Sequence, residues 1–111
     1  MKIPGAERAV VDVAKVRDYL LSPEHRVGSA KARFFEQLGF DQRNWLLLRK
    51  ELQRAAGLEA QVGGATEFGQ KYVVPITIRG PSGQVRSVVV VWIVLNGEDF
   101  PRLVTAYPGA K

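Results

Sequence analysis

One run of ten residues near the C-terminal end, residues 86–95 (from Arg86 to Leu95), restricts the possible folds more than any other segment. After Arg86 and Ser87 it reads VVVVWIVL, without a charged or turn-forming residue. A strand with one face in water shows polar residues at every second position, whereas a continuous apolar run is typical of a strand covered on much of both faces. We therefore predict that this segment is the central strand of an antiparallel sheet.

Two further strands are predicted beside the central one. Residues 70–79 are rich in β-branched side chains, and Pro75 among them cannot donate to a ladder, so this strand should lie at an edge or carry a bulge. Residues 101–107 form the third strand. Gly- and Asn-containing turns at residues 80–83 and 96–100 join the three strands into a meander.

The first half of the chain shows helical periodicity. Apolar residues recur there at spacings of three and four in three stretches, and each stretch starts after a residue suited to capping: Asp12, Ser29 and Asp41. Gly39 is predicted to end the second helix as a left-handed C-cap. Residues 58–66 are predicted to be a crossover without regular structure. The predicted fold is a single α+β domain over residues 1–111, with three N-terminal helices packed on one face of a C-terminal antiparallel three-stranded meander in which strand 86–95 is central.

The composition restricts the possible functions. The chain of 111 residues has 16 basic and 11 acidic side chains and a net charge of +5. Such a charge attracts nucleic acid and other polyanions, although ordinary surface charge for solubility explains it equally well. There is no cysteine and one histidine, so the usual zinc spacings are missing and we expect no metal or other cofactor. Neither a membrane span nor a signal peptide is recognisable, so we expect no membrane partner and a cytoplasmic location.

Strand alternation predicts which side chains share a face of the sheet. If residues 80–83 form the hairpin loop, Lys71 pairs with Trp92. The face that packs against the helices is then purely apolar: Tyr72, Val74, Ile76, Ile78, Val89, Val91, Ile93 and Leu95. The opposite face is partly polar and contains Lys71, Thr77, Arg79, Arg86 and Trp92, and we place Thr105 and Tyr107 of the third strand on it as well.

This partly polar face has the composition of an RNA-binding surface. Lys71 and Arg86 can hold phosphate, Trp92 can stack on a base, and the hydroxyl groups of Thr105 and Tyr107 can bond phosphate or a 2′-hydroxyl. The alternative interpretation is a half-exposed sheet face with ordinary polar residues, in which Trp92 packs under the crossover.

The single histidine, His25, lies in the predicted loop before the second helix. Lys31 and Arg33 follow it in the first turns of that helix. A helix N-terminus binds anions through its free N–H groups, and histidine is the usual acid or base near neutral pH. A surface or capping role for His25 is the alternative.

Three segments together resemble a known family. Residues 3–40 contain the arrangement HxVGxxKAxFF, residues 67–74 contain GQKY, and residues 91–109 end in TAYPG. Over nearly its whole length the chain resembles the bacterial family called domain of unknown function 6883. This family brings no established activity with it.

A more distant resemblance suggests an activity. Helices followed by an antiparallel sheet that ends in a Thr-x-Tyr-Pro strand resemble the barnase, EndoU, colicin and RelE-like superfamily of ribonuclease toxins. The resemblance implies a metal-independent ribonuclease in which the 2′-hydroxyl attacks the adjacent phosphate. The catalytic residues that it implies are His25, Lys31, Lys71, Thr105 and Tyr107, and those that it implies for substrate binding are Arg33, Arg86 and Trp92.

The resemblance also implies roles and partners. His25 or Lys31 would act as acid, base or phosphate ligand. Lys71 and Arg86 would stabilise the phosphorane, and Thr105 and Tyr107 would position the phosphate. The expected partners are RNA and a small acidic antitoxin or immunity-type protein. A non-catalytic module of a toxin–antitoxin-like pair, which binds protein or nucleic acid, is the alternative function.

Overall fold

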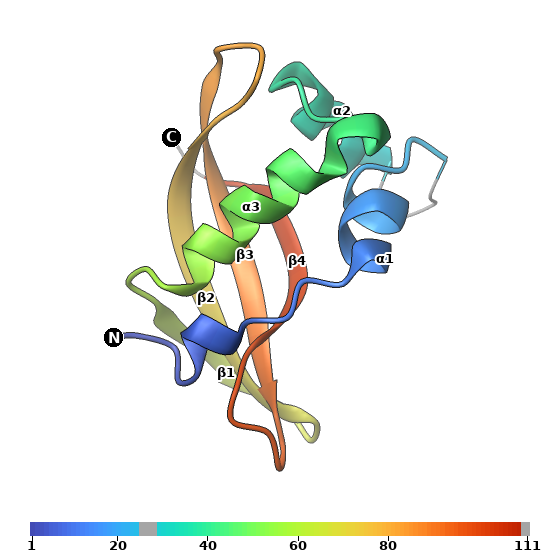
Figure 1. The fold of residues 1–111 in the computed structure, drawn as a ribbon. Coiled ribbons are helices and arrows are strands. Elements are labelled where there is room, and N and C mark those ends of the chain that lie inside the picture. Colours follow the sequence, from blue (N-terminus) through green and yellow to red (C-terminus); the bar gives the residue numbers. More distant parts are fainter. Residues whose placement is uncertain (25–28, 110–111) are drawn as a thin grey trace.

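The computed structural model describes residues 1–24 and 29–109, in which a layer of helices covers one side of a four-stranded antiparallel sheet (Figure 1). The strand order is β1-β2-β3-β4. The α+β class and the helical N-terminal half are as predicted, but the three-stranded meander is wrong because the sheet has a fourth strand. No helix of the described residues is long and apolar enough to cross a membrane.

The helical layer follows the predicted order. A short helix α1 runs directly into a π-helical turn η2, and two longer helices follow, with single 3-10 turns before α1 and α3. Gly39, with φ at 98°, ends the second helix as predicted, and Asp41 caps the turn that leads into the third by accepting from the N–H groups of Arg43 and Asn44. The bounds are η1 Ala6–Arg8, α1 Val13–Lys15, η2 Val16–Leu20, α2 Ser29–Gln37, η3 Gln42–Asn44 and α3 Trp45–Ala56.

The extra strand, β1 (Gln61–Ala65), lies in the segment predicted to be an irregular crossover. Its sequence QVGGA has little β propensity, and it is a strand because its backbone pairs with residues 70–73 of β2. The other strands are β2 (Gly69–Arg79), β3 (Val85–Leu95) and β4 (Arg102–Pro108). The predicted central strand is β3, which lies between β2 and β4. Pro75 lies beyond the last residue that pairs with β1, so its missing N–H interrupts no bond to that strand.

The predicted register between β2 and β3 is wrong by one residue. The loop has five residues, because Arg79 pairs with Val85 and Gly80 donates to the carbonyl of Gln84. The loop is longer than expected because it is bound to the end of α2, where the amide of Ser82 donates to the carbonyl of Leu38 over 2.9 Å. A shift of one residue moves every side chain of a strand to the other face.

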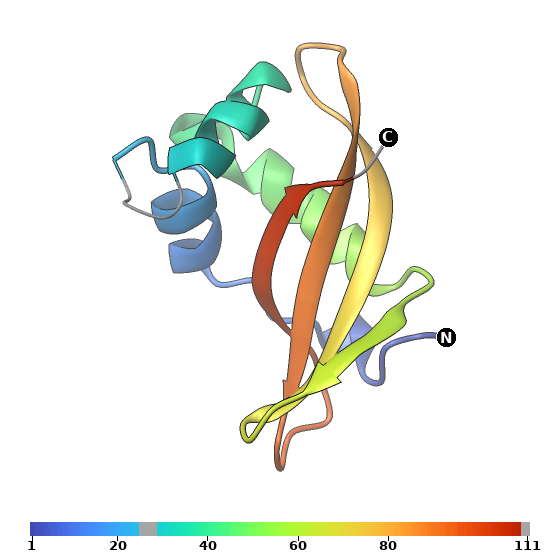
Figure 2. The ribbon, with the colours of Figure 1, turned by 180° about the vertical axis from the view of Figure 1, so that it is seen from behind.

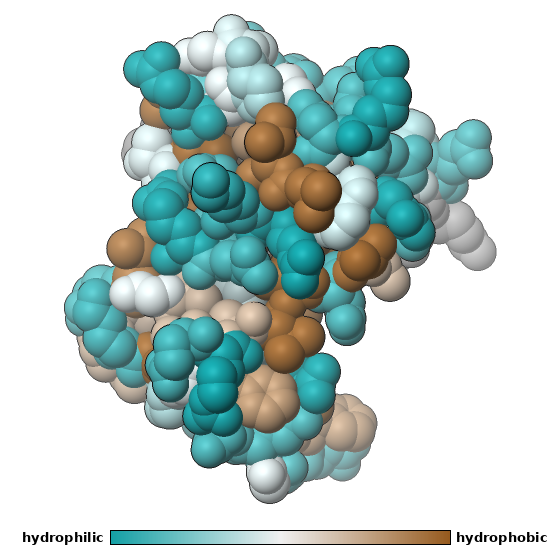
Figure 3. Space-filling view, viewed as in Figure 1, coloured by the Kyte–Doolittle hydropathy of each residue, from teal (hydrophilic) through white to brown (hydrophobic). Residues whose placement is uncertain are grey.

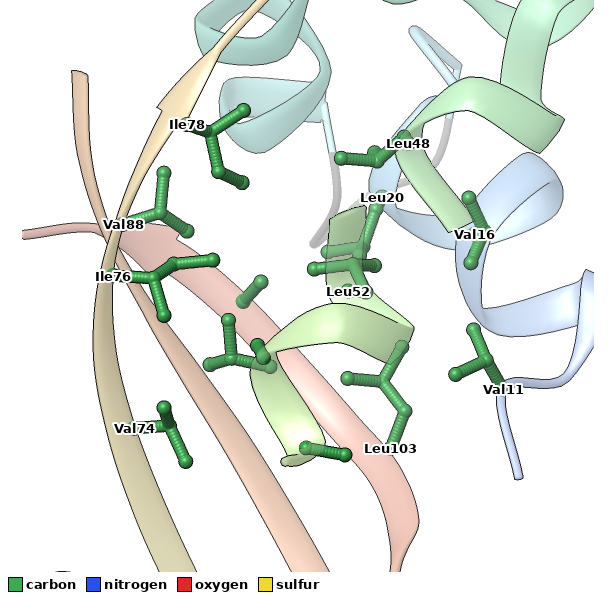
Figure 4. Close-up of a cluster of buried hydrophobic side chains, with 14 of the residues drawn as sticks. Val11, Val16, Leu20, Leu48, Leu52, Val74, Ile76, Ile78, Val88 and Leu103 are labelled. Atoms are coloured by element: carbon green, nitrogen blue, oxygen red, sulfur yellow. The ribbon is translucent and has the colours of Figure 1, made fainter. Parts of the chain in front are cut away.

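The shift decides which residues of β3 form the core. Val88, Val90 and Trp92 lie on the helix side and are fully buried. Figure 4 shows strand side chains pointing toward those of α3 and the α1–η2 segment. The residues drawn and labelled there are Val11, Val16, Leu20, Leu48, Leu52, Val74, Ile76, Ile78, Val88 and Leu103.

The side of the sheet turned away from the helices is called the open face. Contrary to prediction, Val89, Val91, Ile93 and Leu95 lie on it rather than against the helices. In Figure 2 no helix lies in front of β2, β3 or β4 on this side. Its side chains on β2 and β3 are Lys71, Val73, Pro75, Thr77, Arg79, Val85, Ser87, Val89, Val91, Ile93 and Leu95.

A bulge in β4 changes the predicted alternation of that strand. Val91 pairs with Thr105, whereas Trp92 pairs with Leu103, so Val104 is the extra residue. Leu103 and Ala106 are both buried in the core as a result. Regular alternation would put Leu103 on the same face as Thr105, and the bulge instead places them on opposite faces.

Candidate functional site

The corrected register removes Trp92 from the predicted RNA surface. The indole has an exposed fraction of 0% on the helix side of β3, so it cannot stack on a base. Arg86 lies six residues before Trp92 on β3, so it shares the helix side of the strand with Trp92. It lines a crevice with Phe34 of α2 and Pro108 of β4. The predicted placement of these two residues beside Lys71 on one face is wrong.

The other predicted residues are spread over the molecule. Lys71 pairs with Ile93 and Tyr107 with Val89, so they stand four residues, or about 13 Å, apart along β3. Arg33 is exposed on α2. His25 lies outside the described residues, so its predicted role stays a prediction.

Two of the predicted residues, Lys31 and Thr105, meet at a third that the sequence analysis missed, Tyr19. The hydroxyl oxygen of Tyr19 lies 3.3 Å from Oγ1 of Thr105. The ammonium groups of Lys31 and Lys15 lie 5.6 and 5.9 Å from the centre of the Tyr19 ring. These four residues, from η2, α2, α1 and β4, are called the polar cluster.

The polar cluster borders a cleft of about 690 Å³ between the α1–η2 segment and β4. Tyr19, Lys15 and Thr105 line it together with two carboxylates, Asp12 and Asp18. Asp18 is bound by the guanidinium of Arg17 at 2.9 Å, which neutralises its charge. The cleft lining thus contains the ammonium group of Lys15, the hydroxyl groups of Tyr19 and Thr105 and the carboxylate of Asp12, and Lys31 lies beside it at the Tyr19 ring. Among residues 1–24 and 29–109, no three metal-ligating side chains come together.

The surroundings of Tyr19 change its acidity. The hydrogen bond with Thr105 has the largest effect and lowers the pKa of the phenol below its ordinary value, and the ammonium groups of Lys31 and Lys15 lower it further, while burial opposes them. A phenol with a lowered pKa gives up its proton more readily at neutral pH. Tyr19 can therefore donate a proton to a developing oxyanion, which is the task of a general acid.

The backbone at Tyr19 is unusual as well. In the turn η2 the amide of Leu21 donates to the carbonyl of Val16 over 2.9 Å, which is the five-residue spacing of a π-helix. Such turns are rare and are found frequently at functional sites. Val16 and Leu20 anchor the turn in the core, and Tyr19, between them in the sequence, reaches β4.

The sequence gives only a weak signal for Tyr19. It lies three residues after a core position, so a helix would place it at the flank of the buried face. Its contact with Thr105 joins residues that are 86 positions apart, and no local pattern predicts such a contact.

The lysines of the polar cluster differ from half of the ten arginines of the protein. Five arginines are bound to carboxylates: Arg8, Arg17, Arg43, Arg54 and Arg102. In the part of the chain that the structure describes, neither Lys15 nor Lys31 takes part in an ion pair with a carboxylate. The charge of these two lysines is thus available to an anion that enters the cleft.

Comparison with known proteins identifies the family. Residues 2–110 match the model of the family described as a domain of unknown function, DUF6883. The chain belongs to this family. The resemblance inferred from the three sequence segments is thereby confirmed. No curated protein matches the chain.

A solved structure shares the fold of this DUF6883 domain. It comes from a contact-dependent growth inhibition toxin–immunity protein complex of Klebsiella pneumoniae 342. The TM-score is 0.71, the sequence identity is 16%, and the alignment covers 96% of this chain and 97% of the other. At this identity the likeness concerns the fold, which is thus that of a protein found in a toxin–immunity complex.

Proposed function

We propose that this DUF6883 domain is a toxin-type ribonuclease that cleaves RNA in the cleft beside Tyr19. The observation that carries the proposal is the polar cluster, in which Lys31 and Thr105, both predicted as catalytic, meet at a tyrosine with a lowered pKa. The net charge of +5 favours a polyanionic substrate. RNA as the substrate places the proposed reaction in the cytoplasm.

The residues of the cluster suit the cleavage of RNA without a metal ion. The 2′-hydroxyl attacks the adjacent phosphorus, the bond to the 5′-oxygen breaks, and a 2′,3′-cyclic phosphate and a 5′-hydroxyl are formed. Lys31 and Lys15 would stabilise the negative charge of the phosphorane, as cations do in phosphoryl transfer. Tyr19 would donate its proton to the leaving 5′-oxygen, and Thr105 would hold the phenol in place. His25, predicted as an acid, a base or a phosphate ligand, would accept the proton of the 2′-hydroxyl.

A second candidate function is a module that binds a protein partner without catalysis. The fold of a protein from a toxin–immunity complex suits either member of such a pair. The aliphatic open face favours a protein partner as well, because it offers contiguous apolar surface. Both candidate functions include binding to a protein partner. They differ in that only the first includes cleavage of RNA.

The test of the ribonuclease is cleavage of purified tRNA by the purified chain in the presence of EDTA. We expect Tyr19→Phe, Lys31→Gln and Thr105→Val each to lower the rate about 100-fold, the lower end of what general acid–base catalysis contributes. An oligonucleotide that lacks the single 2′-hydroxyl at the cleavage site should resist cleavage. His25→Ala in the same assay tests the predicted base.

The matched control is Lys50→Gln, which removes one charge from an exposed position of α3 outside the cleft. We expect it to keep nearly the full rate, because the loss of a single surface charge weakens only general attraction to RNA. RNA that stays intact at high protein concentration would exclude the ribonuclease and favour the second function. Equal losses in Lys31→Gln and Lys50→Gln would show that the cleft is not the site.

A further inference from the structure

The open face is an apolar surface with positive charge at both ends. Its centre consists of Val73, Val89, Val91 and Ile93, which are half-buried, and Pro75, which is exposed. Lys71 and Arg79 stand eight residues apart on β2, a distance of about 27 Å along the strand. None of the four strands contains an aspartate or glutamate. Contiguous apolar surface of this kind marks an interaction site.

Strand β1 crosses one end of this surface, and in Figure 2 it passes in front of the lower end of β2 and β3. Gly63 lies so close to Val73 that a Cβ atom there would stand 2.8 Å from the Cγ2 atom of the valine. β1 therefore covers part of Val73. Val89 and Val91 of β3 are half-buried and leave apolar surface for a partner.

The chemistry of the open face favours protein over RNA. Bases bind to sheet surfaces by stacking on aromatic rings. The side chains of β2 and β3 on this face include no aromatic residue, and Trp92 is buried on the other side. The face has one exposed ring on its strands, Tyr107 at the β4 margin, where it pairs with Val89, whereas its centre is aliphatic. Aliphatic surface with a charged margin is instead the usual composition of a protein interface.

Charge also argues against a second copy of this chain as the occupant. Two copies would each bring a net charge of +5 and a face whose charged groups, Lys71 and Arg79, are both cations. Like charges opposed in an interface are destabilising. A partner with carboxylates around an apolar patch would match both the aliphatic centre of this face and the cations at its ends.

We infer that the open face is the docking surface for an acidic protein partner, which covers the valines of β2 and β3 and pairs its carboxylates with Lys71 and Arg79. The inference rests on the proposed function for the existence of a protein partner, and it adds where that partner binds. The docking surface and the cleft at Tyr19 share no residue, although they adjoin at β4, where Thr105 pairs with Val91. Ile93 belongs to the surface alone and Lys31 to the polar cluster alone, so changes at these two residues separate binding from RNA cleavage.

The test uses the protein encoded directly downstream of this chain's gene as the probe, with affinity measured by calorimetry. Ile93→Glu and Val89→Glu place a carboxylate in the centre of the face, and we expect each to weaken binding at least 100-fold. Val89→Thr keeps the shape of the side chain and should weaken it less than tenfold. Lys71→Gln and Arg79→Gln should each weaken it three- to tenfold at low salt and less at high salt.

Two controls separate this surface from the rest of the molecule. Leu46 of α3 is 58% exposed on the helix side, where Figure 3 shows hydrophobic side chains among hydrophilic ones, so Leu46→Glu is a matched change outside the open face. It should leave binding unchanged. Circular dichroism and urea unfolding establish that each variant is folded.

The outcomes distinguish this inference from the proposed ribonuclease. Support requires that Ile93→Glu and Val89→Glu lose binding and keep RNA cleavage, and that Lys31→Gln loses cleavage and keeps binding. No complex with the wild-type chain, or a complex that tolerates Ile93→Glu and Val89→Glu, overturns the docking surface even if RNA is cleaved. Self-association of the wild-type chain that Ile93→Glu abolishes would overturn it too, because the occupant would then be a second copy.

Discussion

The two sides of β3 are built from nearly the same residues, yet they have different environments. Val88, Val90 and Trp92 are fully buried against the helices, whereas Val89, Val91 and Ile93 alternate with them and stay half-buried on the open face. Composition does not distinguish the two sets, because both consist of large apolar side chains. The hairpin loop distinguishes them, because its length sets the register, and its length follows from its attachment to α2.

The largest expected effect compares two neighbouring residues on opposite sides. Trp92→Ala should lower the free energy of unfolding by about 3–5 kcal/mol, because a large buried side chain is lost and a cavity remains. The indole nitrogen has no hydrogen-bond partner among the described groups, so the loss comes from packing alone. Ile93→Ala should cost roughly 1 kcal/mol, since that side chain is partly in water. Urea unfolding of both variants measures the difference.

The two variants also test whether residues 92 and 93 lie on opposite sides of β3. If Ile93→Ala destabilised the chain as much as Trp92→Ala, residue 93 would be in the core and the register predicted from the sequence would be the correct one. If both changes had little effect, neither side of β3 would carry the stability of the fold. The first result would also remove the open face as a docking surface.

The sequence predicted the parts of the fold that depend on local patterns. The three helical segments, the position of Gly39 as a C-cap and the central position of β3 all follow from periodicity and residue type. The missed features depend on contacts between distant residues. Strand β1 is stabilised by pairing with β2 rather than by its own residues, and the five-residue loop is stabilised by the carbonyl of Leu38.

The candidate site shows the same division. Lys31 and Thr105 were predicted from residue type and resemblance, and the structure brings them together. Tyr19 was missed because its role depends on a π-helical turn and on a contact across the fold. The predicted place of Trp92 was wrong because every face assignment on β3 depended on one assumed loop length.

A smaller effect tests the cause of the register, which is the contact between the hairpin loop and α2. A Cβ atom at Gly80 would stand 1.9 Å from the carbonyl oxygen of Leu38, and backbone atoms cannot yield as a flexible side chain does. Gly80→Ala should therefore cost about 2 kcal/mol or more. Gly57→Ala is the control, because its nearest atom is 3.8 Å away, and it should change stability by less than about 0.5 kcal/mol. Thermal unfolding of the two variants measures the difference. Equal losses of stability in Gly80→Ala and Gly57→Ala would show that the contact with Leu38 does not hold the loop.

The smallest effect concerns the edge where the two sides of the sheet meet, at Thr105 and Tyr19. Tyr19 should ionise below pH 10, the ordinary value for tyrosine, because the hydrogen bond with Thr105 and the two lysines favour the phenolate. Absorbance at 295 nm should show an early component among the three tyrosines that disappears in Tyr19→Phe. The component should move to higher pH in Thr105→Val.

The lowered pKa of Tyr19 also determines how stability and the rate of RNA cleavage should change with pH. Because the pKa of Tyr19 is lower in the folded than in the unfolded chain, its contribution to stability is absent below the folded value and grows as the pH rises toward the unfolded one. RNA cleavage should change in the opposite direction and fall as Tyr19 ionises, because a phenolate has no proton to donate to the leaving oxygen. A rate that rises through the same pH range would make Tyr19 a base instead, and the proton of the 2′-hydroxyl would then go to the phenolate rather than to His25.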